Sequence, residues 1–246
     1  AAQVQQEIIA GYESYEFHQI YHKLHHFCSL DLGSFYLDII KDRQYTTQSD
    51  SLARRSAQTA LYHIVHALVR WVAPILSFTA HEIWQALPKA GAESVFLTEW
   101  YEGLATLPEN QGQSMLSRDY WQQVMAVKTA VNKEIEEARN RKEVGSGLSA
   151  EVTLYAAPEL KTLLSELGDE LRFVLITSAA TLLDESSEGQ ATDVVGLRVK
   201  VAASTYTKCT RCWHYRADVG SHTTHPDICL RCVDNVAGKG EVRYFA

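Results

Sequence analysis

Four of the five cysteines lie in two close pairs near the end of the chain. They form the motifs Cys209-Thr-Arg-Cys212 and Cys229-Leu-Arg-Cys232, which the 16 residues 213–228 separate. Thiols three positions apart can turn toward one ion through a tight turn, and two such turns complete a tetrahedral four-sulfur site suited to zinc. The alternative is two redox disulfides or buried thiols, which a reducing cytosol disfavours. We therefore predict one zinc ion held by Cys209, Cys212, Cys229 and Cys232.

Three histidines, His214, His222 and His225, lie in the same segment and could replace a sulfur. Four thiolates already saturate a tetrahedron, so we expect these histidines around the ligands or on the surface. A saturated ion has no open position for water. The predicted zinc is therefore structural and replaces a hydrophobic core that about forty residues cannot supply.

The first cysteine motif carries aromatic and basic residues together: Trp213, His214 and Tyr215 stand among Lys208, Arg211 and Arg216. Unstacked bases of an RNA loop can stack on such an aromatic ring while the cations hold phosphates. The alternative is that Trp213 and Tyr215 cover the small core of the module. The residues alone leave both interpretations open.

Two further basic clusters lie at the ends of expected helices. Lys41 and Arg43 end one helix, and Arg139, Arg141 and Lys142 end another, ahead of a Gly-Ser-Gly turn. Cations at a helix C-terminus favour the helix dipole, which is one account of them, and a basic rim for RNA phosphates is the other. We find no phosphate-cradling loop, nucleophile elbow or acid and base pair, and so predict no catalytic residue.

Composition and charge bound the class of protein. The chain has 246 residues, of which 46% are hydrophobic, so it can bury sizeable cores. We expect the protein to be soluble, with no membrane-spanning segment and no secretion signal. Its net charge of −7 is concentrated in residues 151–195, which contain nine acidic residues and two basic ones. The remainder is balanced and can build local basic faces.

Apolar residues at helical spacing predict four helices before residue 89: one long helix ending near Phe27, a second capped by Ser29 or Asp31, a third from about Ser51, and a fourth after Pro74. A long connection follows over Lys89 to Ser117. Asp119 can cap a long helix with an apolar line of Val124, Val127, Val131, Ile135 and Ala138.

After that helix the period changes. Alternation at Val152 and Leu154 predicts a strand, Leu160 to Leu167 a short helix, and Phe173 to Ile176 and Val195 to Val201 two more strands. The predicted fold is mainly α: a helical bundle with its long connection (1–118), a long helix with a small α/β junction domain (119–205), and a four-cysteine zinc finger of zinc-ribbon type (206–246).

Several stretches together resemble the carboxy-terminal region of the bacterial isoleucyl-tRNA synthetases, a family of class I aminoacyl-tRNA synthetases. The resemblance extends over nearly the whole chain. The stretches that carry it are residues 35–45, 53–61, 73–84, 137–149 and the ending from Cys209 to Ala246. The family's nucleotide-binding signatures, His-Ile-Gly-His and Lys-Met-Ser-Lys-Ser, are absent. The resemblance therefore implies a carboxy-terminal third or less of such an enzyme, with the catalytic and editing domains elsewhere.

The resemblance implies that this chain is a cytoplasmic, monomeric piece that holds the anticodon arm of isoleucine tRNA. ATP and isoleucine would be bound only by the absent catalytic domain, and neither DNA nor a membrane is an expected partner. We expect Trp213, Arg211 and His214 near the anticodon, and Lys41, Arg43, Arg139, Arg141 and Lys142 on phosphates.

Two other functions remain as alternatives. One is a zinc-stabilised helical interaction module with no RNA role. The other is a DNA binder with the related finger of the formamidopyrimidine-DNA glycosylases. Salt-sensitive tRNA binding discriminates between the first alternative and the tRNA hypothesis.

Overall fold

The computed structural model describes residues 1–88, 91–106 and 117–246, and the chain divides into two compact units. Unit 1 comprises residues 1–38 and 55–106, and unit 2 comprises residues 39–54 and 107–246. The chain is mainly helical with a small sheet and a cysteine cluster, which confirms the predicted fold class. Of the connection predicted over Lys89 to Ser117, residues 89–90 and 107–116 lie outside the described residues.

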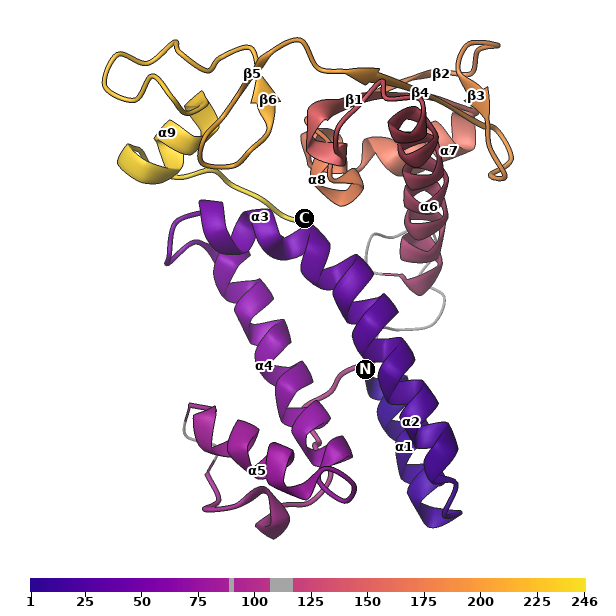
Figure 1. Ribbon diagram of the computed structural model, residues 1–246, viewed down its shortest axis with the longest axis vertical. Helices are drawn as coiled ribbons and strands as arrows, with labels where there is room; N and C mark the ends of the chain where they lie inside the picture. Colours follow the sequence, from indigo (N-terminus) through magenta and orange to yellow (C-terminus); the bar gives the residue numbers. More distant parts are fainter. Residues whose placement is uncertain (89–90, 107–116) are drawn as a thin grey trace. The chain divides into compact units, whose positions relative to one another are not determined.

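Unit 1 is built from helices (Figure 1). Its elements are α1 (Ala2–Glu13), α2 (Phe17–His26), the π-helix η1 (Phe27–Leu37), most of α4 (Leu52–Val72), α5 (Ser77–Ala86) and the 3-10 turn η2 (Val95–Leu97). One apolar cluster joins α1, α2, η1 and α4 through Ile8, Ile20, Phe27, Ala67 and Trp71. A second cluster packs Trp84 of α5 against Val69 of α4 and Val95 of η2.

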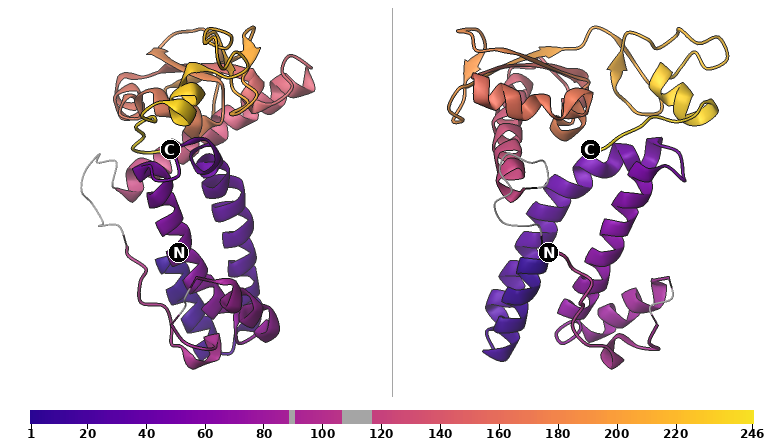
Figure 2. Two further views of the ribbon diagram at one scale, coloured as in Figure 1. Left: turned by 90° about the vertical axis from the view of Figure 1, so that its left-hand side faces the viewer. Right: turned by 180° about the vertical axis from the view of Figure 1, so that it is seen from behind.

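The long first helix predicted from the sequence is wrong, because α1 and α2 form a hairpin and run side by side (Figure 2). The chain reverses at Tyr15, whose φ of 59° lies in the left-handed region. Gly11 permits the close approach of the two helices, since a Cβ there would lie 2.9 Å from Cγ1 of Ile20. Helical spacing alone does not reveal the break, because both halves keep the period of 3.6 residues.

The predicted caps at Ser29 and Asp31 are also wrong. The backbone stays helical from α2 through η1 into α3 (Asp38–Thr46), so neither residue begins a helix. The separate helix predicted after Pro74 is confirmed, because α4 ends at Val72 and α5 begins at Ser77. Proline lacks the N–H that would continue the helix.

Unit 2 contains a four-stranded sheet and the cysteine module. Besides most of α3, its elements are α6 (Arg118–Asn140), η3 (Gly147–Ser149), β1 (Ala150–Ala156), α7 (Pro158–Ser165), η4 (Gly168–Glu170), α8 (Leu171–Leu175), β2 (Ala179–Asp184), β3 (Gln190–Ala191), β4 (Leu197–Ala203), β5 (Thr207–Lys208), β6 (Tyr215–Arg216) and α9 (Leu230–Ala237). The strand order is β2-β1-β4-β3. β1 pairs parallel with β2 and antiparallel with β4.

Helix α6 packs against this sheet through the predicted apolar line, and all five of its residues are buried. Its N-cap is Ser117 rather than Asp119: the Ser117 hydroxyl accepts a hydrogen bond from the Tyr120 N–H at 3.1 Å. Of the predicted strands, those at Val152 and at Val195 to Val201 are confirmed as β1 and β4, and the short helix as α7.

The strand predicted over Phe173 to Ile176 is wrong, because these residues lie in and just after helix α8. All five residues of α8 are buried, Arg172 included, and a single polar position in five residues is too little to reveal a helical period. Lys128 of α6 donates a hydrogen bond to the Val174 carbonyl at 2.9 Å and so satisfies the C-terminus of α8. Ile176, with a φ of 58°, ends the helix in the left-handed region.

Candidate metal centre and nucleic-acid interface

The structure brings all four predicted cysteine ligands together. Their Sγ atoms lie within 4.8 Å of one another, and all four side chains are buried. The Sγ atoms of Cys212 and Cys229 are 3.8 Å apart, too far for a disulfide. A tetrahedral zinc with Zn–S bonds of about 2.3 Å holds its sulfurs about 3.8 Å apart. The donor set and spacing therefore fit one zinc ion.

Two short backbone structures hold the thiols in place. In the first, the Trp213 N–H donates to the Cys209 carbonyl at 3.0 Å, and the Cys209 N–H donates to the His214 carbonyl at 2.9 Å. The second opens a helix, because Cys229 is the N-cap of α9 and Cys232 lies in its first turn. The Cys229 N–H also donates to the Cys209 sulfur at 3.3 Å.

The four thiols act on one another. Their mutual contacts lower the pKa of Cys212 and Cys209 and raise the pKa of Cys229 and Cys232. The N-terminus of α9 adds a partial positive charge beside Cys229 and Cys232. When bound, zinc would cross-link the two motifs, and the four cysteines leave it no position for a reacting water.

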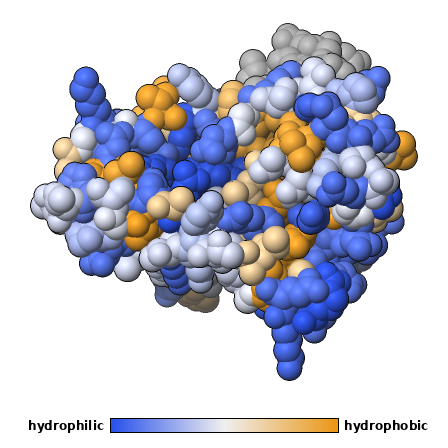
Figure 3. Space-filling model, turned by 90° about the horizontal axis from the view of Figure 1, so that it is seen from above, coloured by the Kyte–Doolittle hydropathy of each residue, from blue (hydrophilic) through white to orange (hydrophobic). Residues whose placement is uncertain are grey.

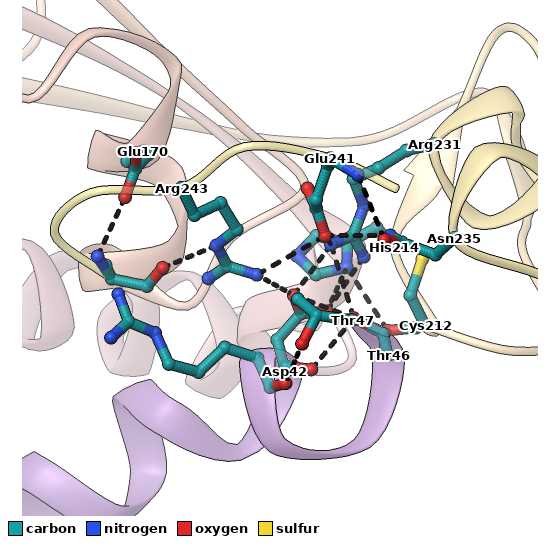
Figure 4. A network of polar contacts seen from close by, with 12 residues as sticks. Asp42, Thr46, Thr47, Glu170, Cys212, His214, Arg231, Asn235, Glu241 and Arg243 are labelled. Carbon is teal, nitrogen blue, oxygen red and sulfur yellow. Dashed lines mark hydrogen bonds and ion pairs between the residues drawn. The ribbon is translucent and has the colours of Figure 1, made fainter. Parts of the chain in front are cut away.

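A buried polar network lies beside the cysteine cluster and centres on Asp42 of α3 (Figure 4). Arg231 of α9 donates two hydrogen bonds to its carboxylate, from Nη1 to Oδ1 at 2.7 Å and from Nη2 to Oδ2 at 2.8 Å. Arg243 donates a third hydrogen bond to Oδ1. Arg231 also donates to Glu241 at 2.9 Å, so two carboxylates face two guanidinium groups.

The electrostatics of Asp42 follow from these partners. Burial alone would raise the pKa of Asp42, whose side chain is 13% exposed. The hydrogen bond from Arg231 and the charges of Arg231 and Arg243 outweigh that effect, and the pKa lies below its usual value. Asp42 is therefore an anion whose loss would leave two buried cations with less compensation.

The expected RNA-contact residues of the zinc finger divide into exposed and buried ones. Trp213 is 59% exposed, its backbone has a φ of 65°, and the Lys208 ammonium lies 5.4 Å from its ring centroid. Arg211 is partly buried and donates to the Thr46 carbonyl at 2.6 Å. His214 is 2% exposed and packs edge-on against Phe173, so its side chain faces the interior.

The expected phosphate contacts divide in the same way. Arg43 of α3 is only 7% exposed, whereas Lys41 is exposed. Arg139, Arg141 and Lys142 are exposed at the end of α6, where Arg139 pairs with Glu136 at 2.6 Å and Arg141 with Glu143 at 2.9 Å. We therefore keep the buried Arg43 and His214 out of the proposed contact surface.

Sequence reasoning missed the residues that organise this region, namely Asp42, Phe173, Arg231, Glu241 and Arg243. Asp42 and Arg231 are 189 positions apart, and no local pattern connects them. The available signal was the arginine inside Cys229-Leu-Arg-Cys232, because an arginine between two buried ligands requires a nearby acceptor or solvent.

On the face seen in Figure 3, hydrophilic side chains cover most of the area and hydrophobic ones are interspersed among them. Across residues 1–88, 91–106 and 117–246, no helix combines the length and apolarity required to span a bilayer.

Comparisons with known proteins agree with this arrangement. Residues 1–154 match the family described as the anticodon-binding domain of tRNA ligase, and residues 208–235 match the zinc finger found in FPG and IleRS. The chain is 57% identical over 248 residues to the isoleucine–tRNA ligase of Methylococcus capsulatus. It is 58% identical to those of Pseudomonas putida and Alcanivorax borkumensis.

These alignments cover 99 to 100% of this chain but 26% of each relative, so the chain spans about a quarter of their length. The zinc-finger match and the four-sulfur cluster together identify one structural zinc site.

Proposed function

Because this chain belongs to the anticodon-binding domain family of tRNA ligases, we propose that it binds the anticodon arm of isoleucine tRNA. The ligase activity, ATP-dependent joining of isoleucine to that tRNA, then belongs to a longer protein that contains this chain. Its relatives named isoleucine–tRNA ligase support this assignment. ATP would be bound by catalytic parts outside this chain, and the chain itself contributes no catalytic residue.

The observation that carries the proposal is the exposed Trp213 on a zinc-supported turn. An aromatic ring held in solvent by a left-handed residue is a strained arrangement that a folded protein maintains only when its surroundings impose it. The nearby Lys208 adds a cation beside the ring. An unstacked anticodon base can stack on Trp213 while Lys208 attracts its phosphate.

The exposed cations Lys41, Arg139, Arg141 and Lys142 supply further phosphate contacts in this proposal. Arg211 orients the first motif through Thr46 and lies two positions before Trp213 in the sequence. The buried Arg43 and His214 support these residues from inside. The chemistry asked of the chain is binding and orientation alone, which suits a part without an acid and base pair.

We retain the three-part division 1–118, 119–205 and 206–246 as part of this proposal, together with a monomeric state and a cytoplasmic location. The reduced, buried thiols suit a reducing compartment. DNA is not a proposed partner.

A filter-binding titration tests the proposal. The full chain is titrated with isoleucine tRNA, a non-cognate tRNA and duplex DNA at two salt concentrations. We expect tighter binding of isoleucine tRNA, weakening as salt rises because bound cations release counterions. Absence of salt-sensitive binding to either tRNA would support the interaction-module alternative, and preference for duplex DNA would support the glycosylase-type alternative.

A further inference from the structure

Asp42 lies where three separate parts of unit 2 meet: α3, the zinc-finger helix α9 and the tail at Arg243. Its carboxylate accepts hydrogen bonds from both terminal nitrogens of Arg231 and from one terminal nitrogen of Arg243. A two-point contact between a planar guanidinium and a carboxylate fixes orientation as well as distance. Asp42 therefore constrains how α9 lies against α3.

Further contacts join the zinc finger to the same turn of the chain. Arg211 donates to the Thr46 carbonyl at 2.6 Å, and the Gln48 side chain donates to the Gly238 carbonyl at 3.0 Å. Gly240 approaches closely as well, because a Cβ there would lie 2.6 Å from Oε1 of Gln48. The finger thus meets residues 42–48 at several points, of which Asp42 is the charged one.

Phe173 of α8 completes the network from the junction domain. The guanidinium carbons of Arg243, Arg172 and Arg231 lie 3.6, 4.0 and 5.0 Å from its ring centroid. Arg243 and Arg172, the two arginines closest to the ring, each have one buried guanidinium nitrogen without a hydrogen-bond partner among the described residues. The cation–π contact with Phe173 compensates these two nitrogens.

The tail is held independently of Asp42. The Glu170 carboxylate accepts hydrogen bonds from the backbone N–H groups of Tyr244, Phe245 and Ala246 at 2.7 to 2.8 Å. Loss of Asp42 would therefore loosen the contact of α9 with α3, while the tail keeps its anchor on Glu170. The zinc ligands are not themselves partners of Asp42, but Arg231 lies between Cys229 and Cys232 in the sequence. Zinc content and docking are therefore measured separately.

We propose that Asp42 is a positioning residue, which holds the zinc finger and its exposed Trp213 against α3 so that finger and helix bind RNA as one surface. The proposal rests on the proposed function above. A surface fixed before binding loses less conformational freedom when the ligand arrives, which favours affinity. In this proposal the exposed Lys41, next to Asp42 in α3, contributes the helix's phosphate contact.

Electrostatics alone predicts the opposite sign for a change at Asp42. Replacing a carboxylate by a neutral amide makes the protein more positive, and a more positive protein attracts a phosphate backbone more strongly. If Asp42 acted only through its charge, Asp42→Asn would tighten tRNA binding. If it positions the finger, the same change weakens binding.

The experiment compares three variants of the full, zinc-loaded chain. Asp42→Asn removes the anchor, and the matched control Asp50→Asn makes the same charge change at an exposed residue beyond α3. Arg231→Lys keeps the net charge but loses the two-point contact. For each we measure zinc content, hydrogen exchange of the α9 amides and the affinity for isoleucine tRNA.

We expect full zinc content in all three variants. We expect faster α9 exchange and about three- to tenfold weaker tRNA binding in Asp42→Asn, a smaller loss of the same kind in Arg231→Lys, and unchanged or tighter binding in Asp50→Asn. If Asp42→Asn fails to fold or loses zinc, Arg231→Lys decides the question, because it leaves no buried charge uncompensated.

Unchanged α9 exchange in Arg231→Lys and Asp42→Asn would overturn the docking role whatever the tRNA result. Faster exchange with unchanged or tighter tRNA binding would overturn the link to RNA. If the unaltered chain itself shows no salt-sensitive tRNA binding, the proposed function fails, while the exchange data still report separately on docking.

Discussion

The core of unit 1 consists of large apolar side chains, whereas that of the zinc finger consists of four thiols. Trp71, Ile8 and Ile20 of unit 1 are fully buried and in contact through one cluster. In residues 206–246 the buried apolar side chains besides the cysteines are Val233 and Ala246. The small apolar area that the finger buries cannot offset the conformational entropy that it loses on folding. A metal ion and an ionic network must supply the missing stability.

Removal of zinc should separate the two regions most strongly. Binding of a structural zinc contributes about 10 kcal/mol or more in small zinc modules, so a strong chelator should unfold residues 206–246. Unit 1 should keep its helices because its clusters contain no cysteine ligand. Hydrogen exchange with and without chelator measures both regions at once, and a finger that stays protected without zinc would contradict the comparison.

The converse change is Trp71→Ala in unit 1. Truncation of a fully buried tryptophan leaves a cavity and typically costs about 3 to 5 kcal/mol. It also removes the hydrogen bond from Trp71 Nε1 to Gln5 Oε1 at 3.0 Å. We expect a lower urea midpoint for unit 1 and unchanged zinc content. Loss of zinc from this variant would show that the regions depend on each other.

Trp213→Ala tests the exposed aromatic ring of the finger. A base stacked on an aromatic side chain is worth about 1 to 3 kcal/mol, so affinity for an isolated anticodon stem-loop should fall by about 5- to 150-fold. Stability should change little because the ring is mostly exposed. Unchanged affinity with an intact zinc site would remove the stacking role and favour a core-covering one.

The double variant Arg139→Gln/Arg141→Gln tests the phosphate role of the α6 terminus. Each lost phosphate contact should reduce the slope of log affinity against log salt by about 0.7 to 0.9. The matched control is Lys133→Gln/Lys161→Gln, whose ammonium groups pair with Asp193 and Asp184. An equal change of slope in both double variants would indicate general charge rather than a contact at Arg139 and Arg141.

The smallest expected effect is a pH dependence in unit 1. Burial, with smaller effects from Arg70 and His63, lowers the pKa of His66 from its usual 6.5. The unfolded state then binds a proton more readily than the folded state. The stability from neutral His66 is present above about pH 6.5 and is lost as pH falls through the lower folded value.

Urea unfolding of the helical signal at pH 7.5 and 5.5 measures this loss, and His66→Gln should make the difference between the two pH values smaller. The same difference in the variant would assign the pH dependence to another group.

The zinc site could be predicted from the sequence because two Cys-x-x-Cys turns are local structures that require only short-range backbone geometry. Likewise the buried line of α6, from Val124 to Ala138, follows from its period of 3.6 residues. The helix α8 could not be predicted, because its five residues are all buried and contain one polar position, which is too little to distinguish a helix from a strand. The reversal at Tyr15 was equally invisible, since it depends on the packing of Gly11 against Ile20.

By itself, then, the sequence determined the metal ligands, the helical class and the resemblance to tRNA ligases, all of which depend on residues close together in the chain. Only the tertiary structure decided that Asp42 joins Arg231 and Arg243, that His214 and Arg43 face inward, and that Trp213 faces solvent. Burial and ion pairing are properties of residues far apart in sequence, and the charge pattern around Lys41-Asp42-Arg43 is the same whether Asp42 is solvated or holds α9 against α3.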